Sequence, residues 1–107
     1  MHIQINTDSN IDGREKLATR IKDVVESALS RFSDRITRIE VHLSDHNGDK
    51  SGQDDKRCMM EARLQGRQPT VVTHDAANLH DAVGGAADKL KRVIESTLGR
   101  LDDVRRA

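Results

Sequence analysis

The sequence predicts an α+β fold in which a four-stranded sheet carries two helices on one face. Three segments alternate between polar and apolar residues, a fourth is typical of a further strand, two have helical periodicity, and their order is β-α-β-β-β-α. Each predicted helix has one apolar stripe and each strand has one apolar face, so both helices are expected to cover the same side of the sheet. The 107 residues contain no repeat, low-complexity tract or linker, and we expect one domain spanning residues 1–107.

The first half of the chain predicts a strand, a helix and a second strand. Residues His2 to Asn6 alternate between polar and apolar, and turn-forming residues follow them. From Arg14 to Phe32 the apolar residues recur at helical spacing, and Asp12 is placed to cap this helix. The segment from Arg35 to Asp45 returns to a period of two, which predicts a half-buried strand.

The second half of the chain predicts two further strands and a long helix. Residues His46 to Asp55 are polar and without periodicity, so we expect a mobile loop with solvated charges. The stretch from Lys56 to Gly66 alternates, the stretch from Pro69 to Asp75 is typical of a further strand, and the segment from Gly66 to Pro69 indicates a hairpin between them. Asn78 can cap a last helix from Leu79 to about Leu101.

Composition excludes several classes of protein. The 18 basic and 18 acidic residues cancel, so any anion-binding site must be local rather than the product of a global field. Phe32 is the only aromatic residue, which argues against binding of nucleic acid by base stacking. The single Cys58 cannot form an internal disulfide, and no apolar run has the ~20 residues that a membrane span requires. We therefore expect a cytoplasmic protein without a membrane partner.

The last predicted helix contains the stretch GGAADKLKR, residues 84 to 92. On a helical wheel with Gly85 as origin, one basic stripe falls within about 60° of this glycine, opposite the apolar stripe. We call this stripe the basic ridge; its members are Lys89, Arg92, Ser96 and Arg100. Lys91 lies outside it. By contrast, the polar face of the first predicted helix mixes acidic and basic residues, as solvated surfaces do.

Both features of this stretch have alternative interpretations. A charged helix face is usually just solvated, so the basic ridge alone does not establish a binding site. Gly84 and Gly85 are explained equally well by close packing of the helix on the sheet and by close approach to a ligand backbone. The sequence does not choose between these interpretations.

No arrangement of residues indicates catalysis or metal binding. His42 and His46 fall at a strand end and in a loop, and His74 and His80 flank a turn without Cys or carboxylates at ligand spacing. Cys58 alternates with apolar residues, so it is expected to be a buried structural thiol. Phosphate-loop, nucleophile and paired-acid motifs are absent. The sequence therefore predicts no enzyme activity, no cofactor, no metal and no small-molecule substrate.

Three features carry a resemblance to a known family: the junction RFSDRITRIEVHLSD, the turn at Gly66 and the helix DAVGGAADKLKRVI. Together with the order of elements, they resemble the ribosome hibernation-promoting and ribosome-associated inhibitor family, also called sigma-54 modulation proteins. The similarity spans nearly the whole chain. It implies a non-enzymatic bacterial translation regulator that binds the small ribosomal subunit, contacts ribosomal RNA and silences or protects idle ribosomes.

The resemblance also nominates individual residues for RNA binding. Lys89 and Arg92 stand where the family motif DKL-x-R supplies basic groups, and Arg35 stands in its DRI motif. Lys91 occupies the variable position of the first motif, and Arg38 is a basic neighbour on the outer face of its strand. With the end of the basic ridge included, the candidate RNA-binding residues are Lys89, Arg92, Arg35, Arg100, Lys91 and Arg38.

A second hypothesis comes from the departures of this chain from the family pattern. Where relatives continue into a lysine-rich helix end, this chain has Glu95, Asp102 and Asp103, and its net charge is zero. These features favour a diverged protein-interaction module of the same fold with weak or no RNA binding. The chain resembles the short family form, so dimerisation through the extra C-terminal domain of long members is not expected. The sequence does not specify the oligomeric state.

Overall fold

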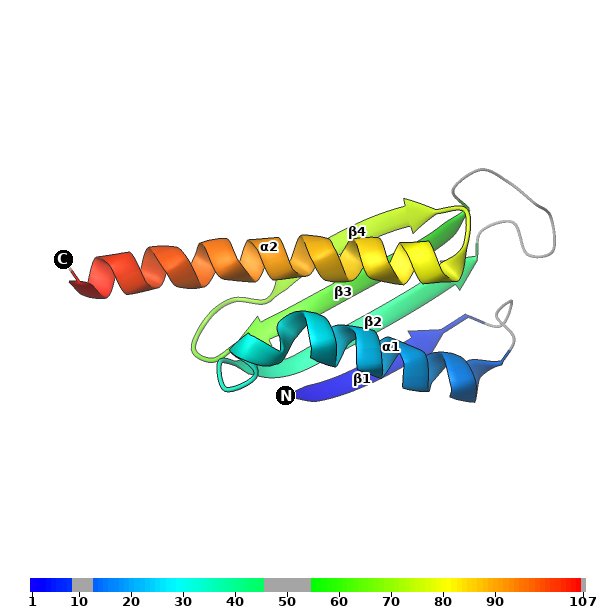
Figure 1. Cartoon of the computed structure of the whole chain (residues 1–107), viewed down its shortest axis with the longest axis horizontal. Helices are drawn as coiled ribbons and strands as arrows, with labels where there is room; N and C mark the ends of the chain where they lie inside the picture. Colours follow the sequence, from blue (N-terminus) through cyan, green and yellow to red (C-terminus); the bar gives the residue numbers. More distant parts are fainter. Residues whose placement is uncertain (9–12, 46–54, 107) are drawn as a thin grey trace.

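The computed structural model describes residues 1–8, 13–45 and 55–106, and residues 101–106 through their backbone only. Its elements follow the predicted order β-α-β-β-β-α, with one additional 3₁₀ turn (Figure 1). They are β1 (His2–Thr7), α1 (Arg14–Leu29), η1 (Ser30–Phe32), β2 (Ile36–Asp45), β3 (Lys56–Leu64), β4 (Thr70–Ala76) and α2 (Leu79–Arg106).

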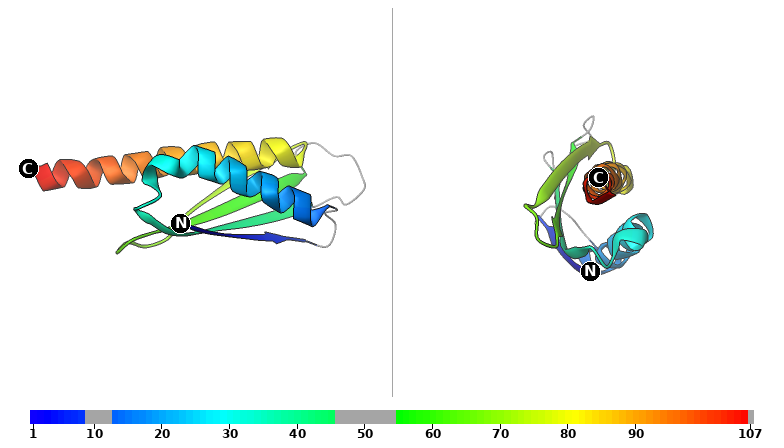
Figure 2. Two further views of the ribbon diagram at one scale, coloured as in Figure 1. Left: turned by 60° about the horizontal axis from the view of Figure 1, so that its bottom comes forward. Right: turned by 90° about the vertical axis from the view of Figure 1, so that its left-hand side faces the viewer.

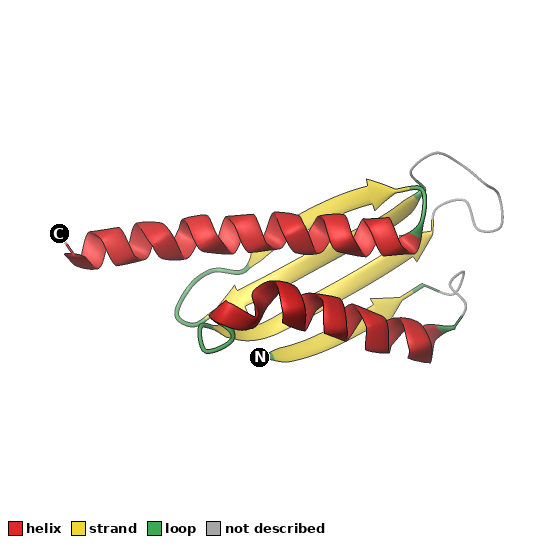
Figure 3. Cartoon of the chain, viewed as in Figure 1, coloured by secondary structure: helices red, strands yellow, loops and turns green. Residues whose placement is uncertain are grey.

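The four strands form one mixed sheet in the order β1-β2-β3-β4. β1 pairs with β2 in parallel, and the other two pairs are antiparallel. Both helices cover the same face of the sheet, as predicted, and the end-on view shows the sheet curving around them (Figures 2 and 3). α2 continues past the sheet at its C-terminal end and reaches Arg106 rather than the predicted Leu101 (Figure 1). Among the described residues, no helix is long and apolar enough to cross a membrane.

The core lies between the helices and the inner face of the sheet. The apolar residues of β2 and β3 that point inward lie opposite one another across the strand pair. The apolar sides of α1 and α2 pack on these residues and complete the core. The most deeply buried large side chains are Ile21, Leu29, Ile39, Met60, Leu90, Ile94, Val25, Val41 and Cys58. The polar residues that alternate with the core positions along the strands lie on the opposite face of the sheet, which neither helix covers (Figure 2).

Each helix begins at the residue predicted from the sequence but ends at a different one. Gly13 is the N-cap of α1, with φ 68°, and Asp12, which was predicted to cap this helix, lies outside the described residues. The predicted helical segment ends as a 3₁₀ turn, Ser30–Phe32, instead of α-helix. The cap of α2 is confirmed, because the Asp81 backbone N–H donates to Asn78 Oδ1 at 2.8 Å.

A buried charge cluster holds the adjoining ends of β2 and β3 together. Lys56 Nζ lies 3.0 Å from Asp55 Oδ2 and 3.2 Å from Asp45 Oδ1, and both carboxylates are buried. The hydrogen bond to Asp55, with the charge of Asp45, raises the pKa of Lys56. Most of the loop expected over residues 46–55 lies outside the described residues, but Asp55 is only 4% exposed. The expectation that all charges of this loop are solvated is therefore wrong at Asp55.

Candidate nucleic-acid interface

The basic ridge is exposed along α2. Leu90, Ile94 and Leu98 are buried, so the residues on the other side of the helix face solvent. All four members of the basic ridge, Lys89, Arg92, Ser96 and Arg100, are exposed. The outward orientation predicted from helical periodicity is therefore confirmed for these four residues, but it is wrong at Gly85, the origin of the wheel, which packs against His74 of β4.

Two of the ridge cations already have partners within the protein. Lys89 Nζ donates to the Thr73 carbonyl oxygen of β4 at 2.8 Å, which ties the middle of α2 to an edge strand of the sheet. Arg92 forms an ion pair with Asp88 at 3.0 Å, one helical turn away. Both side chains of that pair are largely exposed, so the pair adds little stability and can yield to a stronger anion. Arg92 is thus more available to a ligand than Lys89.

The two glycines that precede the basic ridge have different surroundings in the structure. A Cβ atom at Gly85 would overlap the ring of His74, which projects from the inner face of β4. A Cβ atom at Gly84 would meet nothing within 4 Å. At Gly85 the packing interpretation is therefore correct, because the helix approaches the sheet closely there. The exposed residues of the basic ridge follow this contact along α2.

The remaining candidates are not all gathered on the basic ridge. Lys91 is half-buried and lies outside it, as the wheel predicted. Arg38 alternates with the core residues Ile39 and Val41, so it lies on the outer face of the sheet, away from α2. Arg35 immediately precedes the same strand. Apart from Lys91, which lies on neither, the candidate residues therefore divide between two surfaces.

The second surface is formed where β2 begins and the β3–β4 hairpin turns. The backbone N–H of Gln65 donates to the Arg35 carbonyl at 3.0 Å, and Arg38 is the register partner of Arg63. The Arg67 N–H donates to Leu64 O, in a turn where Gly66 has φ 73°. We call this surface the arginine corner; its members are Arg35, Arg38, Arg63 and Arg67.

Two members of the arginine corner, Arg63 and Arg67, are not among the RNA-binding residues predicted from the sequence. The alternation of β3 already placed Arg63 on the outer face, and the glycine turn placed Arg67 in the hairpin. The position of Arg63 opposite Arg38 depends on the β2–β3 register, which contains an irregularity between Ile36 and Arg38. Periodicity within single strands carries no information about this register.

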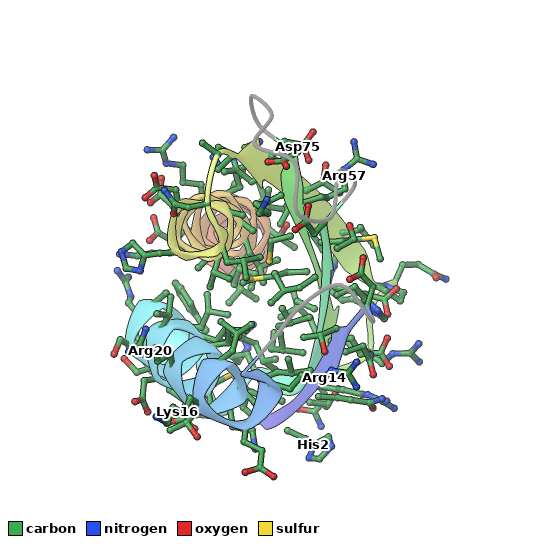
Figure 4. The ribbon with its side chains drawn as sticks, turned by 90° about the vertical axis from the view of Figure 1, so that its right-hand side faces the viewer. His2, Arg14, Lys16, Arg20, Arg57 and Asp75 are labelled. Atoms are coloured by element: carbon green, nitrogen blue, oxygen red, sulfur yellow. The ribbon has the colours of Figure 1, made fainter. Side chains whose placement is uncertain are left out.

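The arginines of the outer sheet face differ in how they are neutralised. Arg38 lies 2.7 Å from Glu40 and also donates to Gln4. Arg57 forms a two-bond pair with Asp75, at 2.8 and 3.2 Å, which raises the pKa of Arg57 (Figure 4). In contrast, Arg35, Arg63 and Arg67 have no carboxylate within 4.0 Å among the described residues.

Comparison with known protein families shows to which family the chain belongs. The model of the family described as Sigma 54 modulation protein / S30EA ribosomal protein matches residues 3–102. The chain belongs to this family. Membership confirms the resemblance carried by the strand junction and by the DKL-x-R stretch of α2. Among curated proteins, no sequence matches the chain.

Solved structures share the family's fold with this chain. A ribosomal subunit interface protein from Coxiella burnetii aligns with TM-score 0.68 and 17% identity, covering 92% of this chain and 99% of its own. The N-terminal domain of Protein Y from Thermus thermophilus aligns with TM-score 0.65 and 24% identity, covering 91% and 99%. At these identities the likeness concerns the fold.

Three side chains that could have supported other chemistry, His74, His42 and Cys58, lie against other groups of the protein. The His74 ring packs on Gly85, and His42 lies 3.7 Å from Glu40. Cys58 is fully buried, and this burial raises its pKa to about 12. In the described part of the chain, no three His, Cys, Asp or Glu side chains are grouped to hold a metal ion.

Proposed function

We propose that this protein is a non-enzymatic, cytoplasmic translation regulator that binds ribosomal RNA of the small ribosomal subunit and silences or protects idle ribosomes. The observation that carries the proposal is the family match over residues 3–102. The similarity of fold to a ribosomal subunit interface protein from Coxiella burnetii supports it. The exposed cations of the basic ridge supply the chemistry.

The expected mode of binding is neutralisation of phosphates. Arg92 and Arg100 present planar guanidinium groups that can bond a phosphate through two N–H groups. The one aromatic residue, Phe32, is buried in the core, so no aromatic platform is available to stack on exposed bases. Contacts of this kind position the protein without reading base sequence, and they weaken as salt increases.

Charge reversal on the basic ridge tests the proposal. We expect Arg92→Glu with Arg100→Glu to abolish co-sedimentation with purified small subunits, because both side chains are exposed and their loss leaves the core intact. Lys89 is left unchanged in this variant, since it also bonds Thr73. The control is Lys16→Glu with Lys22→Glu on the exposed side of α1, which changes the net charge by the same amount.

The control variant is expected to co-sediment as the wild type does. Co-sedimentation of the ridge variant at the wild-type level would contradict the assignment of the basic ridge. Equal losses in both variants would show that net charge, and not this surface, governs binding.

The alternative function is a protein-interaction module, favoured by the zero net charge and by the pairing of Arg92 with Asp88. Capture of partners from a bacterial lysate, with and without nuclease, separates the two functions. RNA binding predicts that ribosomal material is lost after nuclease treatment. A protein partner retained after complete RNA digestion favours the alternative.

A further inference from the structure

The arginine corner concentrates like charges at one end of the uncovered sheet face. Arg38 and Arg63 are directly opposite in the β2–β3 register, which puts their Cβ atoms about 4.5–5.5 Å apart. Like charges in directly opposite positions destabilise a sheet. The hydroxyl of Thr37 donates to the Arg63 carbonyl at 3.0 Å and fixes the irregular pairing that produces this juxtaposition.

The acidic residues nearby compensate this charge incompletely. Glu40 is engaged by Arg38, and its own register partner is Glu61, so the acids form the next row along the sheet. Asp34 precedes Arg35 and accepts a hydrogen bond from Ser33. Neither Glu61 nor Asp34 lies within 4.0 Å of a corner arginine, whereas Arg57, on the same face, has Asp75 as its ion-pair partner.

The backbone around the arginine corner is fixed by hydrogen bonds. The Gln65–Arg35 and Arg67–Leu64 bonds close the turn at 3.0 and 3.1 Å, so the arginines project from a defined frame. Arg63 and Arg67 are exposed, and the side chain of Arg38 is 43% exposed. Its buried Nε has no hydrogen-bond partner among the described residues. Several guanidinium groups on one rigid frame suit an anion with several oxygen atoms.

We propose that the arginine corner is a second phosphate-binding surface, on the opposite face of the sheet from the basic ridge, and that its ligand is the RNA backbone. The inference rests on the proposed function, which supplies the RNA. It adds a contact that no residue of α2 makes and assigns binding roles to Arg63 and Arg67. Binding of phosphate would also relieve the repulsion between Arg38 and Arg63.

The first test measures phosphate binding without ribosomes, using inorganic triphosphate as the probe. We expect triphosphate to raise the melting temperature of the wild type above its value in sodium chloride of equal ionic strength. In Arg63→Gln with Arg67→Gln, this rise should shrink by at least half. In chloride alone the same variant should melt higher than the wild type, because a like-charged neighbour of Arg38 is gone.

Two further variants make this test specific. Lys16→Gln with Lys22→Gln, on α1, should keep the full response to triphosphate, and Arg63→Lys with Arg67→Lys should give an intermediate one, since lysine retains charge but not two-bond contact. The inference is overturned if the wild type does not respond to triphosphate. It is equally overturned if the Arg63→Gln, Arg67→Gln variant keeps the full response.

The second test uses purified small subunits and distinguishes RNA from free phosphate as the ligand. Removal of two phosphate contacts should lower the magnitude of the slope of log affinity against log salt by about 1.5. If the wild type binds and the Arg63→Gln, Arg67→Gln variant has the same affinity and slope, this inference fails while the proposed function stands. If the wild type does not bind at all, the proposed function fails and RNA is excluded as the ligand of the arginine corner.

Discussion

The adjacent residues Gly84 and Gly85 differ in their surroundings, although both are interior to α2. Gly84 has open space where a Cβ would lie. We expect Gly84→Ala to raise the free energy of unfolding by about 0.5–1 kcal/mol, because alanine loses less backbone entropy in a helix. Urea denaturation with an unchanged m value checks the effect.

Gly85→Ala is expected to do the opposite. Its Cβ would overlap the His74 ring, and forcing apart well-packed groups costs about 1–3 kcal/mol, more than the gain in helix propensity. Adding His74→Ala to this variant should recover part of the loss, because the overlapping ring is then absent. Equal stabilities of the two single alanine variants would contradict the close approach of α2 to β4.

Cys58 should be inert in the folded protein. Burial raises its pKa to about 12, so iodoacetamide at pH 8 should modify it only after unfolding. Because the folded state holds the thiol proton more tightly, stability is retained below pH 9 and falls as pH rises toward 12. The chain has no tyrosine to mask this effect. Between pH 9 and 10 the stability of Cys58→Ala should fall less steeply than that of the wild type, and equal slopes would argue against a buried thiol.

At the scale of elements, the lysine that joins β2 and β3 should matter more than an exposed one. Lys56→Met leaves the buried carboxylates of Asp45 and Asp55 without its ammonium group, and removing one partner of such a pair is destabilising because the remaining charges stay buried. Urea denaturation at pH 7 should show this loss of stability. Lys16→Met, on exposed α1, serves as the control; a comparable loss there would refute the role of the cluster.

The elements themselves follow from local patterns in the sequence. The alternation of Ile39, Val41 and Leu43 and the helical spacing on α2 were sufficient, because burial of one face imposes those periods. Asn78 signalled the start of α2 for a similarly local reason. In contrast, the burial of Asp55 was not predictable, because it depends on Lys56 and Asp45 meeting across a strand pair.

At the scale of the whole molecule, the candidate interface was only partly accessible to sequence reasoning. Helical periodicity found the basic ridge, since its members lie on one element. The arginine corner joins a loop, two strands and a hairpin, so only the pairing of β2 with β3 sets Arg63 opposite Arg38 and joins the turn that carries Arg67 to Arg35. Likewise, the bond from Lys89 to Thr73 links two elements and reduces the number of cations free to bind a ligand.

The central claim is that a neutral protein binds ribosomal RNA through a small number of local phosphate contacts. The most direct test is the affinity of the wild type for purified small subunits over a series of salt concentrations. Three to five contacts predict a slope of log affinity against log salt of about −2 to −5. Binding that does not change with salt, or no binding at low salt, would contradict the claim.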